Sequence, residues 1–161
     1  MNKKILIVDD EEQVHKVTSL VLGSCSFDHA EAELFHAYSM KEAKQLLDNE
    51  PPFALALVDV VMETDDAGLR LVKYIRDELK DKDIRLVLRT GQPGQAPEED
   101  VIMKYDINDY KQKTELDRKR LFTAVVTALR AYRDIIEIEL SRKYEQEYKN
   151  GLKTVIEATA S

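Results

Sequence analysis

Two short apolar runs that each end in aspartate constrain the fold of this chain most. Residues 5–8 run directly into Asp9 and Asp10, and residues 54–58 run directly into Asp59. Both runs are continuously apolar and rich in branched side chains, which is typical of strands buried on both faces of a parallel sheet. In open α/β sheets, ligands bind just beyond the carboxyl ends of the strands. If the two strands are neighbours, three carboxylates converge on one small volume.

The rest of the first 130 residues alternates between strand and helix patterns. Further strands are predicted at 33–37, 84–88 and 107–110, and helices at 11–22, 39–49, 69–79 and 98–104. Ser39 and Glu42 predict a capping box at the start of the second helix. Strands joined by right-handed helical crossovers predict a flavodoxin-like, doubly wound α/β fold. Its five-stranded parallel sheet has helices on both faces.

The last third of the chain is one long helical pattern. From Thr114 to about Asn150 it contains no Pro or Gly, and we expect Thr114 to cap its start and Gly151 to end it. A pattern longer than about 25 residues is unusual for a helix that only packs on a domain. The residues expected to cover the sheet are Leu121, Phe122, Val125, Val126 and Leu129.

Beyond these residues, an apolar stripe from Tyr132 to Tyr148 is expected to lie outside the core. We predict a domain at residues 1–130, and a continuing helix, linker or coiled coil at 131–150. Residues 151–161 would be the truncated start of a downstream segment. The stripe suggests a homodimer through this helix, although its spacing is not a clean heptad. The alternative is a helix that packs on a further domain.

Composition excludes several classes of function. The 161 residues carry a net charge of −7, which argues against a nucleic-acid or anionic-membrane partner. The single cysteine, Cys25, allows no internal disulfide and fits a reducing compartment. Only four apolar residues follow Lys4, whereas a signal peptide needs roughly 7–15, so a cytoplasmic location is expected. The histidines at 15, 29 and 36 show no metal-ligand spacing.

Chemistry-bearing residues collect at the ends of the predicted strands: Asp9, Asp10, Asp59, Thr90 and Lys113. Unit charges 4 Å apart interact by about 4 kcal/mol at an effective dielectric constant of about 20, so three clustered carboxylates need a cation. Oxygen ligands with open positions suit Mg²⁺. Lys113 supplies a second cation, and Thr90 a hydroxyl donor. A carboxylate held in this way is suited to attack phosphorus.

This arrangement resembles the receiver domain of two-component response regulators, over about residues 3–130. The resemblance implies that Asp59 is the phospho-acceptor and that a histidine kinase or phosphotransfer protein is the donor. It implies Mg²⁺ binding by Asp10 most directly, with Asp9, Asp59 and the backbone carbonyl of Val61. It implies no enzymatic activity beyond the domain's own phosphotransfer and dephosphorylation.

The resemblance also assigns the residues that respond to phosphorylation. Thr90 corresponds to the switch hydroxyl, Gly91 to the small residue after it, and Lys113 to the lysine that stabilises the phosphoryl group. Tyr110 matches the aromatic residue that changes rotamer on activation. The implied output is the face formed by the fourth helix, the fifth strand and the fifth helix.

The chain departs from the family pattern at two positions. Thr114 follows the lysine and Glu63 lies four residues after the acceptor, where the family usually has proline. Residues 89–94 and 108–116 resemble a narrower subgroup, in which a receiver precedes a GAF-like segment and an HD-GYP cyclic-dinucleotide phosphodiesterase. Residues 151–161 resemble the start of that GAF-like segment.

Two other functions remain open at the level of sequence. The first is an enzyme that uses Asp59 as the nucleophile of a phosphatase or phosphotransferase on a small substrate. Haloacid-dehalogenase enzymes have such an aspartate, but they have a second aspartate two residues later, where this chain has Val61. The second is a docking module that keeps the fold without being phosphorylated.

Overall fold

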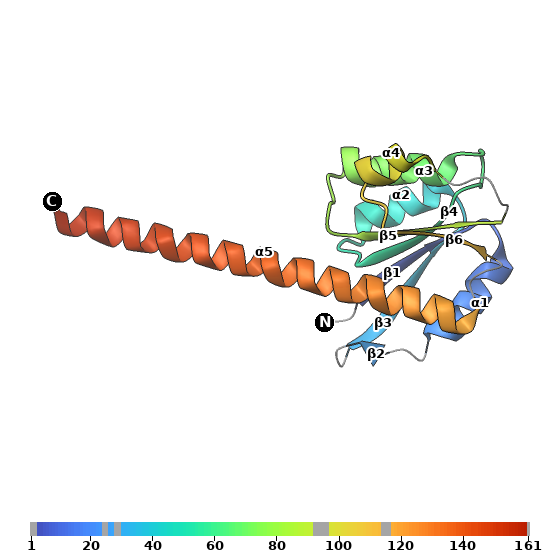
Figure 1. The fold of residues 1–161 in the computed structure, drawn as a ribbon, viewed down its shortest axis with the longest axis horizontal. Helices are drawn as coiled ribbons and strands as arrows, with labels where there is room; N and C mark the ends of the chain where they lie inside the picture. The colour runs from blue at the N-terminus through green and yellow to red at the C-terminus, as the bar shows by residue number, and fades with distance from the viewer. Residues whose placement is uncertain (1–2, 24–25, 28–29, 92–96, 114–116, 161) are drawn as a thin grey trace.

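A six-stranded sheet forms the centre of the protein (Figure 1). The computed structural model describes residues 3–23, 26–27, 30–91, 97–113 and 117–160. The strand order is β2-β3-β1-β4-β5-β6, and all pairings are parallel except that of β2 with β3. The strands are β1 (Lys3–Val8), β2 (Ser26–Phe27), β3 (Ala30–Ala37), β4 (Leu55–Asp59), β5 (Arg85–Thr90) and β6 (Asp109–Gln112). The predicted doubly wound fold is confirmed. The additional strand β2 was not predicted, because two residues make no periodic pattern.

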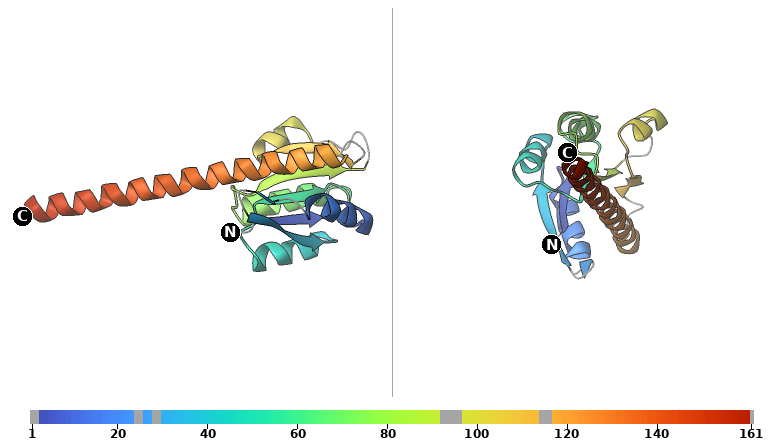
Figure 2. Two further views of the ribbon diagram at one scale, coloured as in Figure 1. Left: turned by 90° about the horizontal axis from the view of Figure 1, so that it is seen from below. Right: turned by 90° about the vertical axis from the view of Figure 1, so that its left-hand side faces the viewer.

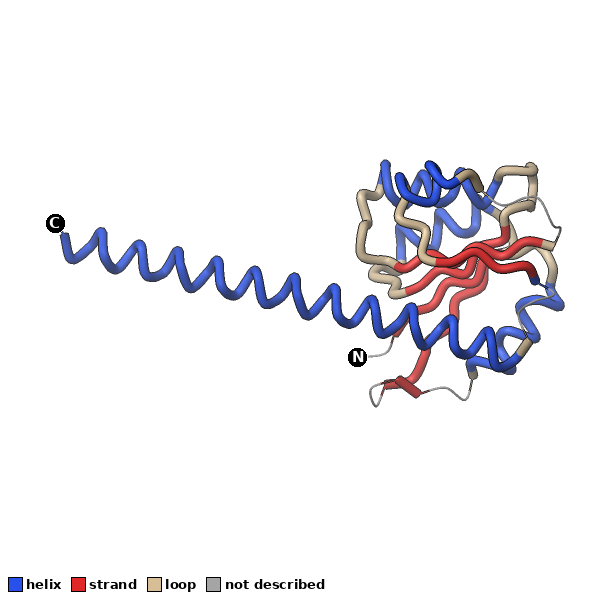
Figure 3. Tube along the Cα trace, in the orientation of Figure 1, coloured by secondary structure: helices blue, strands red, loops and turns tan. Residues whose placement is uncertain are grey.

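The helices cover both faces of this sheet (Figures 1 and 3). Helices α2 (Met40–Asn49), α3 (Ala67–Lys73) and α4 (Glu99–Lys104) lie on one face, while α1 (Glu12–Leu22) and α5 (Arg118–Ala160) lie on the other. A π-helical turn, η1 (Tyr74–Glu78), continues α3. Because both faces are covered, the central strands read as continuous apolar runs rather than as alternating ones.

The two apolar runs that predicted the sheet divide their side chains between its faces. Leu6 and Val8 belong to the core under α2 and α3, while Ile5 and Ile7 belong to the core under α1 and α5. All four side chains are fully buried. Burying an aliphatic side chain of this size contributes about 1.5–3 kcal/mol, so the strands that carry the acidic residues are held firmly.

Some predicted element ends are found only in part. The hydroxyl of Ser39 accepts a hydrogen bond from the backbone N–H of Glu42, as the capping box predicts, but the Glu42 carboxylate accepts from Tyr38 rather than from Ser39. The strand predicted at 107–110 begins two residues later. Asp106, in a left-handed conformation with φ of 50°, forms a turn that leaves Ile107 in the core before β6 begins.

Helix α5 is longer than predicted. Asp117 directly precedes its first turn, and the Asp117 carboxylate accepts a hydrogen bond from the N–H of Arg120; Thr114 lies outside the described residues. Gly151 does not end the helix, which continues to Ala160. Glycine is less favourable than alanine in a helix by about 1 kcal/mol, which is not enough by itself to end a long helix.

The buried face of α5 also extends further than expected. Leu121, Val125 and Leu129 are buried, whereas Phe122 is 43% exposed. Tyr132, which was expected beyond the core, is only 8% exposed, and Ile136 packs against the same cluster. Every residue from 140 to 160 is exposed, and Figure 2 shows this outer part of the helix projecting away from the domain. No helix among the described residues is long and apolar enough to cross a membrane.

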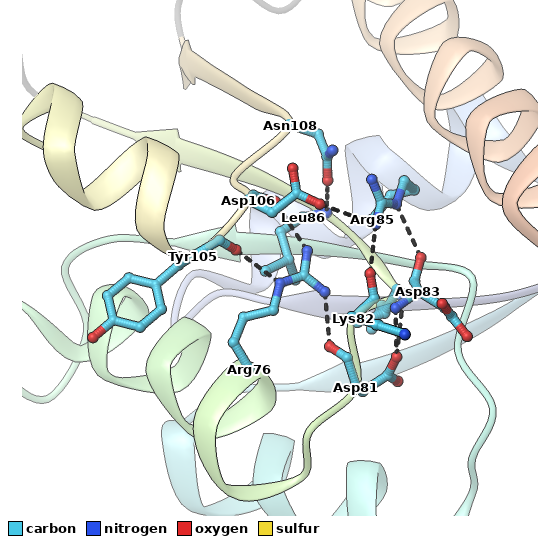
Figure 4. Close-up of polar contacts among 10 residues, drawn as sticks. Arg76, Asp81, Lys82, Asp83, Arg85, Leu86, Tyr105, Asp106 and Asn108 are labelled. Atoms are coloured by element: carbon cyan, nitrogen blue, oxygen red, sulfur yellow. Dashed lines mark hydrogen bonds and ion pairs between the residues drawn. The ribbon is translucent and has the colours of Figure 1, made fainter.

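The amino-terminal edge of the sheet is tied together by arginines (Figure 4). The guanidinium of Arg76, in η1, donates to the backbone carbonyls of Tyr105, Asp81 and Asp106 at 2.7, 2.8 and 2.9 Å. Arg85, at the start of β5, donates to two further carbonyls at 2.7 and 2.9 Å. These bonds join the loops that precede β5 and β6, two neighbouring strands at one side of the sheet.

Candidate functional site

Three carboxylates converge at the carboxyl-terminal edge of the sheet. Asp9 and Asp10 follow β1, and Asp59 is the last residue of β4, which pairs directly with β1. One oxygen from each of the three lies within 4.8 Å of the others. Asp9 and Asp59 are buried, while Asp10 is exposed. The predicted convergence is therefore present, and the cluster opens to solvent on the side of Asp10.

Lys113 binds this cluster from beyond the end of β6. Its ammonium nitrogen lies 3.0 Å from a carboxylate oxygen of Asp9 and 3.2 Å from one of Asp59. A third carboxylate, that of Glu11, also lies 3.0 Å from this nitrogen. Glu11 was not predicted as a site residue, although its place directly after the acidic pair is a signal that could have been used. One lysine is thus shared by three carboxylates.

The electrostatics of the site are unfavourable without a further cation. Burial raises the pKa of Asp59 to about 6, the charge of Asp9 adds to this effect, and Lys113 and the Val61 N–H oppose it. Burial lowers the pKa of Lys113, but its hydrogen bonds to Asp9 and Glu11 and the nearby negative charges raise it to about 12 overall. Lys113 therefore remains a cation, and a single lysine does not neutralise the carboxylates.

The donor set fits a divalent cation with a preference for oxygen. Asp9, Asp10 and Asp59 could each offer a carboxylate oxygen, and the exposure of Asp10 leaves room for water. Mg²⁺ takes oxygen ligands and keeps several waters, so these residues are suited to it. A bound divalent cation would also remove the repulsion that raises the pKa of Asp59.

The loop between β4 and α3 is fixed by two contacts of its own. The Glu63 carboxylate accepts hydrogen bonds from the N–H of Met40, at the start of α2, at 3.0 and 3.2 Å. The N–H of Gly68 donates to the carbonyl of Val60 at 2.9 Å. A Cβ atom at position 68 would lie 2.2 Å from the carbonyl oxygen of Asp59, so only glycine fits. Glu63, which replaces the proline usual in the resembling family, thus anchors the loop that follows Asp59.

The sequence of the chain is similar to those of two known proteins. No family model matches the chain. The chain is 50% identical over 157 residues to the 3'3'-cGAMP-specific phosphodiesterase 2 of Vibrio cholerae, and 33% identical over 128 residues to the response regulator protein PilR of Pseudomonas aeruginosa. These matches cover 98% and 80% of the chain but only 29% and 26% of the relatives' lengths.

Solved structures agree with the sequence matches. A CheY-like response regulator receiver domain protein from Methanospirillum hungatei superimposes with a TM-score of 0.67 at 22% identity, over 83% of this chain and 98% of that one. The chain folds as a response-regulator receiver domain. The Mn²⁺-bound form of the response regulator Rcp1 superimposes with a TM-score of 0.60 at 25% identity, over 78% and 90% of the two chains.

The other residues predicted for the site lie at or near the carboxyl-terminal ends of β5 and β6. Thr90 is fully buried at the end of β5, one residue after Arg89, which pairs in register with Asp59. Gly91 is exposed, and a Cβ atom there would meet no other atom within 4 Å. Tyr110 is half-buried on β6, and its buried hydroxyl has no partner among the described residues. The switching roles of Thr90, Gly91 and Tyr110, and the metal contact of the Val61 carbonyl, stay predictions.

Helix α1 supports the site with residues that the sequence did not single out. A ring nitrogen of the buried His15, Nε2, lies 2.7 Å from the backbone carbonyl oxygen of Asp9. Because a carbonyl only accepts, this nitrogen carries the proton. One turn further along α1, the hydroxyl of Thr18 accepts a hydrogen bond from Arg89 at 3.0 Å. The inner face of α1 therefore contacts both the acidic loop and the end of β5.

Proposed function

We propose that this receiver domain accepts a phosphoryl group on Asp59, with Mg²⁺ held by Asp9, Asp10, Asp59 and the Val61 carbonyl. The observation that carries the proposal is the meeting of three carboxylates and Lys113 at one edge of the sheet. The donor would be a histidine kinase or a phosphotransfer protein. The receiver-domain fold supports this choice, as does the similarity to the response regulator protein PilR.

The proposed reaction is a displacement at phosphorus. An oxygen of the Asp59 carboxylate forms a bond to the phosphorus, while the bond from phosphorus to the donor breaks and its electron pair leaves with the donor. With a pKa of about 6, Asp59 is mostly ionised at neutral pH and is available as the nucleophile. Lys113 offsets negative charge on the transferred group, and Thr90 donates a hydrogen bond to it. Bound Mg²⁺ would supply further positive charge toward the phosphoryl oxygens.

Phosphorylation would then change the surface made by α4, β6 and α5. The modified side chain carries about −1.5 to −2 charges and new acceptor oxygens. Thr90 would move toward these oxygens, with Gly91 leaving space for the change, and Tyr110 would fill the volume that Thr90 vacates. The half-buried Tyr110, with no hydroxyl partner among the described residues, supports this role.

The test is the mass of the protein after incubation with Mg²⁺ and acetyl phosphate. Wild type is expected to gain one phosphoryl group, and Asp59→Ala to gain none. Asp65→Asn, in the exposed loop that follows β4, is the control and should be modified like wild type. Equal modification of Asp59→Ala would show that the acceptor is a different residue. Turnover of simple phosphate esters at enzyme-like rates would instead favour a phosphatase.

We propose that the output is regulation of a cyclic-dinucleotide phosphodiesterase of the HD-GYP type. The relative that is 50% identical is a 3'3'-cGAMP-specific phosphodiesterase, and the chain matches 29% of its length. The chain itself is then a regulatory module without hydrolytic activity of its own. Incubation of the chain with 3'3'-cGAMP should leave the dinucleotide intact, and measurable hydrolysis would contradict this assignment.

We further propose that α5 connects the receiver to its output as a homodimeric helix. Residues 1–130 would form the receiver, residues 131–150 the connecting helix, and residues 151–161 the start of the next segment. Exposed apolar side chains continue along the helix at Leu140, Tyr144 and Tyr148. Sedimentation of wild type is expected to give a dimer, and of the double variant Tyr144→Glu, Tyr148→Glu a monomer. Equal masses would rule out pairing through this part of the helix.

A further inference from the structure

Arg89 is a buried cation that neither the proposed phosphotransfer nor the packing of the core accounts for. It lies on β5 at the position that pairs in register with Asp59, and it is only 3% exposed. One guanidinium nitrogen, Nη1, donates to the Thr18 hydroxyl at 3.0 Å. The other two, Nε and Nη2, have no hydrogen-bond partner among the described residues. A buried charge with unpaired donors is destabilising, so its presence needs a reason.

The charges that act on Arg89 belong to the acidic cluster. Burial lowers the pKa of this guanidinium, and the negative charges of Asp9 and Asp59 oppose that effect. Arginine keeps its charge even under such conditions. Arg89 is therefore a permanent positive charge that lies beneath the site, on the side covered by α1. Lys113 approaches the same two carboxylates from beyond the end of β6.

We infer that Arg89 is a fixed counter-charge that tunes the site, weakening its hold on the divalent cation and stabilising the phosphorylated form. The inference rests on the proposed function, its first half on the metal site and its second half on the phosphotransfer. Four carboxylates meet here, those of Asp9, Asp10, Glu11 and Asp59. Opposed by Lys113 alone they leave three negative charges, and opposed by Lys113 and Arg89 they leave two. A single divalent cation neutralises two negative charges, so it balances the site only when Arg89 is counted.

Arg89 should have opposite effects on the two ligands of the site. It repels a metal ion, so its removal should tighten Mg²⁺ binding by ~10-fold or more, since like charges repel strongly where water is largely excluded. It attracts the extra negative charge of a phosphoryl group, so its removal should weaken the binding of a phosphoryl mimic. A residue with a merely structural role would weaken both when it is replaced. The opposite signs therefore identify the electrostatic role.

Two control variants separate the charge from the hydrogen bond. Arg89→Lys keeps a positive charge and should bind Mg²⁺ with nearly the wild-type dissociation constant. Thr18→Val removes the hydrogen bond that the guanidinium makes with α1 but leaves its charge, so its Mg²⁺ affinity should also stay close to wild type. Both variants are expected to unfold at lower denaturant concentration than wild type.

The experiment is calorimetric titration of the full chain with Mg²⁺, followed by titration with beryllofluoride at saturating Mg²⁺. Arg89→Met and Arg89→Gln are expected to bind Mg²⁺ more tightly and beryllofluoride more weakly. Unchanged Mg²⁺ affinity in these variants, or weaker binding of both ligands, overturns the inference. If wild type binds Mg²⁺ but no beryllofluoride, the proposed phosphotransfer fails while the metal half of the inference stands.

A measurement on wild type covers the case in which the neutral variants do not fold. The Nε–H of a buried arginine is visible by nuclear magnetic resonance, because it exchanges slowly with water. Its signal should shift when Mg²⁺ binds and shift again with beryllofluoride. No response of the Arg89 signal to Mg²⁺ would show that the guanidinium does not sense the site, and would overturn the inference.

Discussion

The two edges of the sheet differ in how completely the protein itself pairs their charged side chains. At the amino-terminal edge, each guanidinium nitrogen of Arg76 donates to a backbone carbonyl (Figure 4). At the carboxyl-terminal edge, two nitrogens of Arg89 lack a partner among the described residues, and three carboxylates share Lys113. At the first edge the guanidinium is fully paired by the protein itself, whereas at the second a buried guanidinium and a cluster of carboxylates have charge left over for the proposed ligand. Violations of ordinary packing rules are expected at functional sites.

The difference predicts that the amino-terminal edge contributes more to stability. Arg76→Ala should lower the free energy of unfolding by about 3–4 kcal/mol, because hydrogen bonds from a charged donor contribute about 1.5–3 kcal/mol each and are not additive. The measurement is urea unfolding followed by circular dichroism. Arg70→Ala, an exposed residue of the neighbouring α3, is the control and should change the stability by less than about 0.5 kcal/mol. A loss below about 1 kcal/mol for Arg76→Ala would show that the three bonds are not an important support.

Backbone packing beside Asp59 is the next most sensitive feature. Gly68→Ala should destabilise the protein by about 2–3 kcal/mol, the upper part of the usual range for overpacking, because its Cβ atom overlaps the Asp59 carbonyl. Gly91→Ala is the matched control, since a Cβ atom there has open space, and it should leave the stability within about 0.5 kcal/mol of wild type. Equal effects of the two substitutions in urea unfolding would contradict the close approach of α3 to β4.

The acidic edge should gain stability when one of its charges is removed. The pKa of Asp59 is about 6 in the folded protein and about 4 when unfolded, so its ionisation disfavours folding as the pH rises through 6. Without metal at pH 7, Asp59→Asn should therefore stabilise the protein by about 1–2 kcal/mol, a value reduced from the full shift because water is close. The gain should disappear as the pH falls toward 4, where wild type is also uncharged at this position.

Thermal unfolding across this pH range measures the effect, with Asp65→Asn as the exposed control. Added Mg²⁺ should reverse the order of stability, because wild type keeps a ligand that Asp59→Asn lacks. If Asp59→Asn were less stable than wild type at pH 7 without metal, the repulsion assigned to the carboxyl-terminal edge would be wrong.

The sequence predicts the carboxyl-terminal edge better than the amino-terminal one. Asp9, Asp10 and Asp59 could be placed because each follows an apolar run, and parallel strands bring their carboxyl ends together. The arginines of the other edge could not be placed, since their partners are backbone carbonyls that carry no sequence signal. Arg89 was missed for a similar reason: an arginine within a buried strand looks like an edge residue until its burial is known.

The length of α5 shows a second limit of prediction from sequence. Gly151 is a common stop signal, but the helix passes through it, because a stop also needs a chain that turns away. Conversely, Tyr132 was assigned to the exposed stripe, because periodicity does not say how far the edge of the sheet extends along the helix. Local signals set the type of an element, and the surrounding structure sets its bounds.

The smallest predicted effect concerns Glu63, which ties the acidic edge to α2 through an exposed contact. Glu63→Ala should lower the free energy of unfolding by about 0.5–1 kcal/mol, the usual contribution of a carboxylate at a helix N-terminus, and 1 M salt should reduce the loss. Asp65→Ala, in the same loop, should have no measurable effect. The contact also holds the segment that carries Val61, so Glu63→Ala should weaken Mg²⁺ binding about two- to threefold in a calorimetric titration. A loss of stability without any change in Mg²⁺ affinity would show that Glu63 caps α2 but does not position the loop of the metal site.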